Sequence, residues 1–364
     1  MTENNRDRHD LRVYEIYNLE DLQFMKILNT IFSQTTGGVD SVFCNYNKCL
    51  IDDGHELFLA ISNNKYCNYQ ASKIFKLKNI SPILDCFHLL YICYKIKPDV
   101  IICHSPRSMI MAGYLKYFIK AKSIAINHSM SYKKSMKCDY VISVNQEIND
   151  ALVKCGFPSK KSFVLSNAIE VSEKFKSKKL SPIVKIGLYG RLDYNKGFDI
   201  LIKAAKIINE RGVDFRLKLG GFETSEGLRW QDIKKMTLDA GIKEKCQFIG
   251  KIVDKKTFFT DVDLFCAPSR HEAFGMVMLE AFLYSTLVIS SDTDGGKQLI
   301  KDQESGLLFK NENPSDLADK IILATERPDT YNIMTKNAYR ELKDKYSLDI
   351  LQKRLENILL KIIN

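Results

Sequence analysis

The sequence predicts an α/β protein built from two Rossmann-like domains, and three observations support that prediction. Its 364 residues exceed what one hydrophobic core usually organises, so the length indicates about two domains. Short, almost wholly apolar segments alternate with probable helices in both halves of the chain, as in parallel sheets covered by helices on both faces. A lysine-rich stretch, VSEKFKSKKLSP at 171–182, separates the two sets and predicts the interdomain linker.

The first set of elements is expected over residues 25–180. A buried strand is predicted at MKILNTIFS, followed by QTTGGVD and a probable helix. A strand that leads into paired glycines and a helix begins many nucleotide-binding domains. Further strands are predicted at ELFLAIS, DVIICHS, SIAINHS, YVISVN and SFVLSN, with a helix over 146–155. Residues 1–24 form an N-terminal extension, and the sequence leaves open whether they are an extra helix or an over-long gene start.

The second set is expected over residues 181–340 and repeats the alternation. Strands are predicted at KIGLYGR, FRLKLGG, CQFIG, DLFCAPS and TLVISS, with helices between them, notably at 196–211 and 275–284. The last segment, 341–364, contains SLDILQKRLENILLKII, in which apolar residues recur at helical spacing. We expect this amphipathic helix to pack on the body of the protein.

Composition and charge narrow the class of protein. No apolar run approaches the roughly 20 residues that span a bilayer, and the N-terminus lacks an apolar signal region. We therefore expect a cytoplasmic protein. The ten cysteines stand singly, which is typical of reduced thiols in that compartment. Charges sum to −4 over 1–70, +12 over 71–180 and +2 over 181–364. The positive charge of residues 71–180 has two interpretations. It is an ordinary solvated basic face, or it binds an anionic membrane surface, which would place the protein peripherally on the inner face of the cytoplasmic membrane. No nucleic-acid-binding motif is present.

Charged residues cluster where the second set of strands should end, which is where open parallel sheets bind ligands. One strand ends at Gly190 and Arg191, and Lys196 is expected to open the next helix. The stretch PSRHEAFGMVMLEA follows another strand and carries Glu272 and Glu280. Carboxylates in a nearly apolar stretch need partners, because an unpaired buried charge is costly.

The same stretch predicts a binding site for a phosphorylated sugar. Free backbone N–H groups near Phe274, Gly275 and Met276 form an anion site at a helix start, and Arg191 and Lys196 supply the charge that suits a diphosphate. The two glutamates are then free to accept hydrogen bonds from hydroxyl groups on either side of it. A ligand with sugar hydroxyls on both sides of a diphosphate is a nucleotide-diphosphate sugar. The alternative, that both glutamates only complement a helix dipole, is disfavoured because Glu280 lies too far into the helix.

These residues carry a resemblance to a known family. GLYGRLDYNKGFDILIKA, FIGK, PSRHEAFGMVMLEA and GLLF, in that order, resemble the retaining GT-B glycosyltransferases of the large family that includes bacterial lipopolysaccharide-core, capsule and phosphatidylinositol mannosyl transferases. The resemblance covers about residues 25–364 and is most specific in the second half. It implies two Rossmann-like domains whose parallel sheets face a central cleft, the first binding an acceptor and the second a nucleotide sugar.

The resemblance also implies roles for individual residues. Arg191 and Lys196 match the diphosphate-binding pair, Glu280 the glutamate that holds the ribose hydroxyls, and Glu272 the glutamate at the donor sugar. The other matching positions are Gly37 and Gly38 below the phosphates, Gly190 beside Arg191, Phe274, Gly275 and Met276 at sugar and phosphate, Ile249 and Gly250 at the base, and His128 near the donor sugar. We expect His128, Arg191, Lys196 and Glu272 to be catalytic. The sequence departs from the family at Ala168, usually a glycine, and at Gln298, usually a glutamate.

The implied activity is a metal-independent transfer, of hexosyltransferase type, with the sugar's configuration retained. The donor is expected to be a UDP-sugar, with no further cofactor, and the acceptor a glycan or lipid-linked molecule of cell-envelope polysaccharide or lipopolysaccharide synthesis. DVD at 261–263 and DTD at 292–294 are similar to a metal motif of another fold, but no metal site is expected because Arg191 and Lys196 neutralise the diphosphate.

Two alternatives come from other classes of protein. A catalytically inactive relative could bind a nucleotide sugar as a regulator, and the departures at Ala168 and Gln298 leave room for it. An NAD-dependent oxidoreductase is the remote alternative. It would need G-x-G-x-x-G after a first strand, and TTGGVD does not supply that motif.

Overall fold

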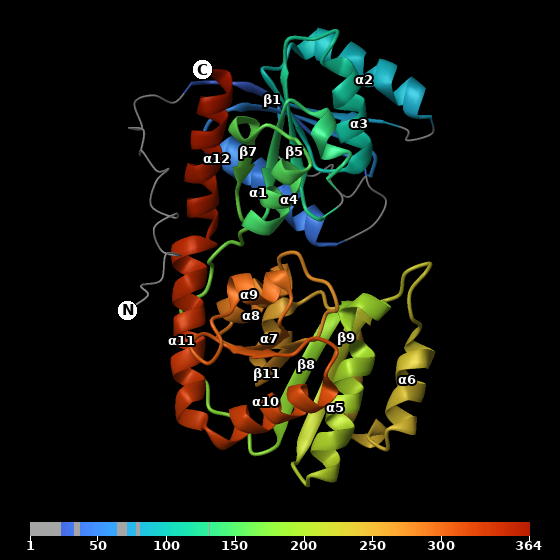
Figure 1. Ribbon diagram of the computed structural model, residues 1–364, viewed down its shortest axis with the longest axis vertical. Helices are drawn as coiled ribbons and strands as arrows, with labels where there is room; N and C mark the ends of the chain where they lie inside the picture. The colour runs from blue at the N-terminus through green and yellow to red at the C-terminus, as the bar shows by residue number, and fades with distance from the viewer. Residues whose placement is uncertain (1–22, 33–36, 64–70, 78–80, 131) are drawn as a thin grey trace.

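The computed structural model describes residues 23–32, 37–63, 71–77, 81–130 and 132–364. Residues 1–22 of the expected N-terminal extension lie outside this range. Two parallel sheets of seven and six strands form the cores of two domains, which lie one above the other in Figure 1. The predicted fold class, two Rossmann-like α/β domains, is confirmed. Among the described helices, none is both long and apolar enough to cross a membrane.

The first sheet has the strand order β3-β2-β1-β4-β5-β6-β7, and its paired strands are parallel. Its strands are β1 (Lys26–Ile31), β2 (Glu56–Ile61), β3 (Lys73–Lys76), β4 (Val100–Cys103), β5 (Lys122–Asn127), β6 (Tyr140–Ser143) and β7 (Ser162–Val164). β3 was not predicted, because its four residues KIFK are half lysine and lie at an edge of the sheet. The central strands are buried on both faces, which explains their continuous apolar runs.

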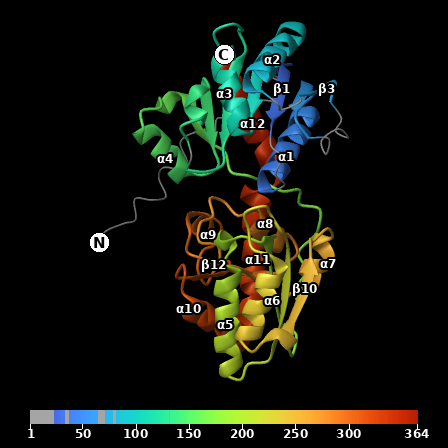
Figure 2. The same ribbon diagram turned by 90° about the vertical axis from the view of Figure 1, so that its right-hand side faces the viewer.

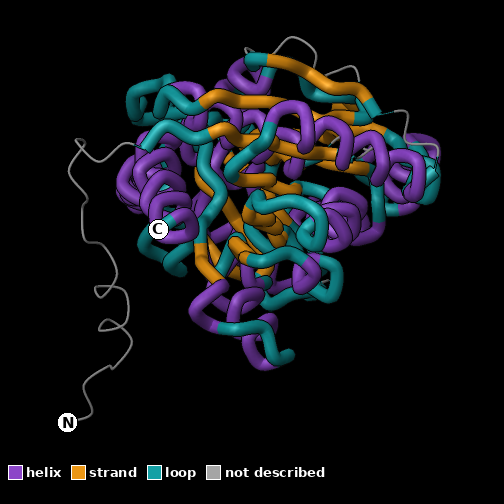
Figure 3. The backbone as a smooth tube through the Cα atoms, turned by 90° about the horizontal axis from the view of Figure 1, so that it is seen from above, coloured by secondary structure: helices purple, strands orange, loops and turns teal. Residues whose placement is uncertain are grey.

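Helices cover both faces of the first sheet. They are α1 (Gly38–Asp52), α2 (Pro82–Ile96), α3 (Pro106–Leu115), α4 (Gln146–Lys154) and the C-terminal α12 (Leu348–Ile363). α1 and α12 pack together on one face, whereas α2 and α3 pack on the other. Seen from above in Figure 3, the strands run between layers of helices.

The second sheet has the strand order β10-β9-β8-β11-β12-β13 and is also parallel. Its strands are β8 (Val184–Arg191), β9 (Phe215–Phe222), β10 (Cys246–Gly250), β11 (Leu264–Ala267), β12 (Leu287–Ser291) and β13 (Leu307–Phe309). The remaining helices are α5 (Phe198–Glu210), α6 (Trp230–Asp239), α7 (Lys255–Thr260), α8 (Met276–Leu283), α9 (Asp294–Leu299), α10 (Pro314–Glu326) and α11 (Pro328–Lys345). α5, α6 and α10 cover one face, and α7, α8 and the end of α11 cover the other.

One predicted helix start needs correction. Lys196 does not open a helix: it ends a 3-10 turn, Tyr194–Lys196, and α5 begins at Phe198. The turn closes because the Asp193 carboxylate accepts a hydrogen bond from the Lys196 N–H (3.0 Å). The C-terminal helix predicted at SLDILQKRLENILLKII is confirmed as α12, Leu348–Ile363, whereas residues 341–345 of that segment belong to the end of α11.

The chain crosses between the domains twice, and the two crossings are hydrogen-bonded to each other. The Ile169 N–H donates to the Tyr346 carbonyl (3.0 Å), and the Leu348 N–H donates to the Ile169 carbonyl (3.1 Å). Figure 1 shows α11 and α12 as a red column that passes from the second domain to the first. α12 is then fixed to the first domain by Leu351, Leu355 and Leu359 in its core and by a His55–Glu356 contact of 2.8 Å.

Candidate active site

Lys196 and Glu272 meet at the carboxyl end of the second sheet. The Lys196 ammonium lies 2.7 Å from the Glu272 carboxylate, and about four-fifths of each side chain is shielded from solvent, with 21% and 19% exposed. Arg191, the last residue of β8, is more open: 46% of its side chain is exposed, and its guanidinium lies 3.1 Å from Asp193. The structure therefore places a shielded ion pair beside an accessible arginine.

Lys196 reaches this position because the turn that carries it packs tightly on the loop at 268–272. Gly197 has a φ of 68°, and a β-carbon there would lie 2.0 Å from the Pro268 carbonyl oxygen, so only glycine fits. The Asn195 side chain donates to the His271 carbonyl and accepts from the His271 N–H, both at 2.9 Å. These contacts fix the spacing between Lys196 and Glu272.

A buried arginine anchors the same loop. Arg270 donates two hydrogen bonds to Asp199 (3.0 and 2.9 Å), and its guanidinium stacks 3.5 Å from the Tyr194 ring. Only 8% of the Arg270 side chain is exposed. Arg270 was not among the predicted site residues. The signal that could have found it was a second charge in a stretch that is otherwise apolar.

Glu280 has partners of its own, which sequence analysis did not find. It projects from α8, and its carboxylate accepts hydrogen bonds from the Tyr189 hydroxyl and the Lys255 ammonium. Burial, and then the Glu280 charge, raise the pKa of Tyr189 far above its ordinary value, so the hydroxyl stays protonated and donates. Tyr189 is fixed by edge contacts with Phe258 and Phe259. Glu280 is therefore a positioned acceptor.

The start of α8 faces the first domain. Gly275 precedes α8 with a φ of 95°, and the first N–H groups of any helix lack carbonyl partners within it. Gly38, the first residue of α1, lies against Met276: a β-carbon built on Gly38 would be 3.6 Å from the Met276 side chain. Helix starts from both domains thus meet here, and positive helix ends favour an anion.

The other predicted positions are distributed around this meeting point. Gly37 caps α1, and Gly190 lies directly before Arg191. Ile249 and Gly250 end β10, where Ile249 is 38% exposed. The Phe274 side chain is buried against Tyr346. The Asn145 side chain, at the start of α4, donates to the Ala273 carbonyl (2.7 Å) and ties this loop to the first domain.

His128 lies in the first domain, just after β5, with its ring stacked on that of His104 at 5.9 Å. Phe43 and Tyr46 contact the edge of the His104 ring. Burial lowers the pKa of His128 to about 4. Burial, and then the neighbouring His128, lower the pKa of His104 well below its ordinary value. Both rings are therefore neutral near pH 7.

This pair predicts a loss of stability in acid. Unfolded histidine titrates near pH 6.5, so the unfolded chain takes up protons first, and the free energy of unfolding should fall between about pH 6.5 and 4. The loss is at most about 1.4 kcal/mol per pH unit for each histidine. Urea unfolding at pH 7 and pH 5 should show a smaller difference in His128→Gln than in the wild type. His88→Gln, at an exposed position of α2, is the control, and an equal flattening in both variants would contradict this assignment.

One of the two departures from the family pattern, Gln298, makes a contact between the domains. The Gln298 side chain, in α9, donates to the Ser166 hydroxyl of the first domain (3.1 Å). Ala168 is buried, and its carbonyl accepts from the Asn45 side chain (2.6 Å). Gln298 thus contributes a neutral contact between the domains in this structure.

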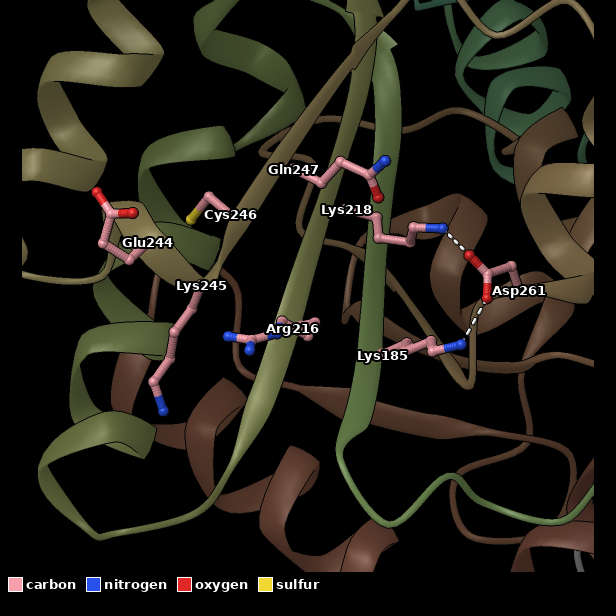
Figure 4. A pocket seen from close by; sticks show the side chains of 8 residues that line it. All are labelled: Lys185, Arg216, Lys218, Glu244, Lys245, Cys246, Gln247 and Asp261. Atoms are coloured by element: carbon pink, nitrogen blue, oxygen red, sulfur yellow. Dashed lines mark hydrogen bonds and ion pairs between the residues drawn. The ribbon is translucent and has the colours of Figure 1, made fainter.

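In each of the two D-x-D stretches, at least one carboxylate is bonded to other residues of the protein. Asp261 pairs with Lys185 (2.6 Å) and Lys218 in a basic pocket of about 250 Å³ (Figure 4). This pocket is built on the first residues of β8, β9 and β10, so it lies at the opposite end of the sheet from Lys196 and Glu272. Asp292 accepts from the Asn311 N–H (2.8 Å).

A family model described as glycosyl transferases group 1 matches residues 171–341. A lipopolysaccharide core biosynthesis mannosyltransferase of Rhizobium leguminosarum is 27% identical over 45% of this chain and 47% of its own length. A capsular polysaccharide biosynthesis glycosyltransferase of Staphylococcus aureus is 25% identical over 66% of this chain and 62% of its own. The chain thus spans less than two thirds of these relatives. A poly(ribitol-phosphate) alpha-N-acetylglucosaminyltransferase of S. aureus is 25% identical over 92% of this chain and 70% of its own.

Solved structures show the same fold over nearly the whole chain. A glycosyltransferase from Rickettsia africae superposes with a TM-score of 0.80 at 19% identity, over 93% of this chain and 98% of that one. Anabaena HepE in complex with UDP and glucose superposes with a TM-score of 0.79 at 17% identity, over 92% and 99%. At these identities the likeness concerns the fold alone.

Proposed function

Residues 171–341 of this chain match the family of group 1 glycosyl transferases, and from that match we propose that the protein transfers a sugar from a nucleoside diphosphate to a hydroxyl group, with retention of configuration. The observation that carries the proposal is the Lys196–Glu272 ion pair at 2.7 Å. Glu272 lies in the loop that leads into the start of α8, a place suited to an anion.

A bound diphosphate would change the partners of these side chains. Its oxygens would take the place of Glu272 on the Lys196 ammonium, which frees the Glu272 carboxylate to accept hydrogen bonds from the donor sugar. Arg191, with its accessible guanidinium, would bind the same diphosphate from β8. On the other side, Glu280 would exchange the Lys255 ammonium for ribose hydroxyls, while Tyr189 keeps its carboxylate in position.

The positive groups would also promote the reaction itself. Negative charge builds on the diphosphate as the bond to the sugar breaks, and Lys196, Arg191 and the start of α8 are positioned to stabilise it. With that charge supplied by the protein, the transfer needs no divalent cation or other cofactor. The proton of the attacking hydroxyl would pass to the departing phosphate on the same face of the sugar, which gives retention. His128, neutral near pH 7, would be able to accept a hydrogen bond from the donor sugar.

The proposed donor and the proposed acceptor are supported by different relatives and by the charge of the first domain. UDP is the proposed nucleotide, and the HepE structures in complex with UDP and with UDP-glucose support it. The lipopolysaccharide-core and capsule relatives support an acceptor in cell-envelope glycan synthesis. The +12 charge of residues 71–180 supports a lipid-linked acceptor, bound with the enzyme peripheral on the inner face of the cytoplasmic membrane.

Calorimetry with UDP, GDP and ADP in buffer containing EDTA tests the proposal. We expect UDP to bind tightly without metal and the other two weakly. NMR of the anomeric proton after turnover of a UDP-sugar with an acceptor should show the configuration of the donor. Binding without any turnover would favour the inactive regulator. Absence of binding for all three nucleotides would remove the basis of the proposal.

A further inference from the structure

The outer face of α2 and α3 is unusually apolar for an exposed surface. Among the residues that the structure describes, sixteen large apolar side chains are exposed, and eight of them lie between residues 83 and 118. They are Ile83, Leu84, Phe87, Tyr91 and Tyr94 of α2, and Tyr114, Tyr117 and Phe118 at the end of α3. We call these eight residues the α2–α3 face. Such concentrations mark contact sites rather than ordinary surface.

The exposed positions of α2 follow the helix repeat. Leu84, Phe87, Tyr91 and Tyr94 are spaced by three and four residues, so they form one stripe along the helix. Each of these four side chains is 59–67% exposed. In Figure 1, α2 and α3 lie on the right of the first sheet and α12 on the left, and Figure 2 shows α2 and α3 toward the viewer. α2 and α3 therefore lie on the opposite side of the first sheet from the C-terminal helix.

An apolar groove of about 800 Å³ runs between the two helices. Phe87 and Leu90 line it from α2, and Ile110 and Met111 line it from α3. The charged residues that line it are Arg107 and Lys134, and Arg107 also pairs with Asp85, which joins α3 to α2. Phe32, which directly follows β1, also lines the groove. The groove thus extends toward the carboxyl end of the first sheet, where Gly37 and Gly38 lie.

Lysines border this apolar face. Residues 82–137 contain nine lysines and arginines against two aspartates, and one aspartate, Asp85, is already paired. Two lysines lie directly against the tyrosines: the Lys116 ammonium is 5.4 Å from the Tyr117 ring and the Lys137 ammonium 5.9 Å from the Tyr114 ring. Lys133 and Lys134 are also exposed beside it.

From this combination we infer that the α2–α3 face docks on an anionic lipid bilayer. Aliphatic and phenylalanine side chains would enter the acyl region, tyrosines would lie at the interface, and lysines would contact headgroup phosphates. The charge argues against a second copy of this chain, because two such faces would bring like charges together. The inference deepens the proposed function, since it places the open end of the groove at the membrane and its inner end at Phe32, at the carboxyl end of the first sheet. A lipid-linked acceptor could then remain in the bilayer while its hydroxyl reaches the donor.

Cosedimentation of the full chain with vesicles tests this docking. We expect binding to vesicles of mixed phosphatidylglycerol and phosphatidylcholine, weak binding to phosphatidylcholine alone, and a steep loss at high salt. The double variant Phe87→Ser/Phe118→Ser should lose at least about tenfold in partitioning, because two large apolar side chains no longer enter the bilayer. The matched control is Leu238→Ser/Ile333→Ser, two positions of the second domain with similar exposure, 60% and 59%, and it should bind like the wild type.

Several outcomes would overturn the inference. These are absence of wild-type binding, an equal loss in both double variants, and a wild-type dimer that disappears only in Phe87→Ser/Phe118→Ser. UDP binding without vesicles separates this test from the proposed function, because Phe87 and Phe118 lie outside the predicted donor site. Loss of UDP binding in every protein, with vesicle binding kept, would contradict the transferase proposal and leave the docking face intact.

Discussion

Replacing Glu280 with alanine should abolish measurable UDP binding. The carboxylate is 12% exposed and would hold two ribose hydroxyls through charge-assisted hydrogen bonds, each of about 1.5–3 kcal/mol. Losing both corresponds to a decrease in affinity of about a hundredfold or more. Isothermal titration calorimetry with UDP measures the change, and Glu280→Gln should fall between alanine and wild type because it keeps an acceptor without the charge.

Two controls make this result specific to the ribose end of the donor. Tyr189→Phe removes only the hydroxyl that donates to Glu280 and keeps the ring against Phe258 and Phe259, so it should bind UDP within a few-fold of wild type. Inorganic diphosphate should bind Glu280→Ala as it binds the wild type, since Lys196 and the start of α8 are unchanged. Unaltered UDP binding by Glu280→Ala would contradict the assigned role.

The second large effect is expected at Lys196. Lys196→Met keeps much of the side-chain volume and removes the charge, so the departing diphosphate loses a stabilising partner while Glu272, 2.7 Å away, stays negative. Turnover of a UDP-sugar at saturation should fall about 10²–10³-fold, the scale seen when one stabilising donor is removed from an active site. The rate of UDP release under saturating donor and acceptor measures the effect.

Lys203→Met provides the comparison for this variant. Lys203 lies on the same helix that follows Lys196 and pairs with Asp199 at 3.6 Å, but 67% of its side chain is exposed. An exposed pair of this kind contributes little, so its turnover should match that of the wild type. Thermal unfolding of both variants shows whether a loss of activity reflects unfolding. Turnover by a folded Lys196→Met protein within about threefold of the wild type would contradict the proposed electrostatic role.

Much of the fold could be predicted because its central strands are buried on both faces. Runs such as the VIIC of β4 are apolar without interruption, which is a local signal. β3 and β13 were missed as strands because they have only four and three residues, and their pairing depends on neighbours distant in sequence. The start of the C-terminal helix was predicted at Ser347, one residue before α12 begins, because its apolar residues repeat at helical spacing.

The candidate site, like the fold, could be predicted only in part from the sequence. Arg191, Lys196, Glu272 and Glu280 stand in short motifs and could be named from their order and spacing. Their partners could not, because Tyr189 and Lys255 meet Glu280 from other elements. The Asn145 contact with Ala273 joins residues 128 positions apart. Such tertiary contacts leave no periodic trace in the sequence.

The paired crossings at Ile169 and Ser347 restrict how the two domains can move. If the chain crossed between the domains only once, one domain could both bend and twist relative to the other. Two crossings that are hydrogen-bonded side by side restrict the twisting of one domain against the other. The motion that remains is bending about a line through the two crossings. Donor groups on the second domain and acceptor groups on the first would then return to the same alignment after every opening, because the motion retraces one arc.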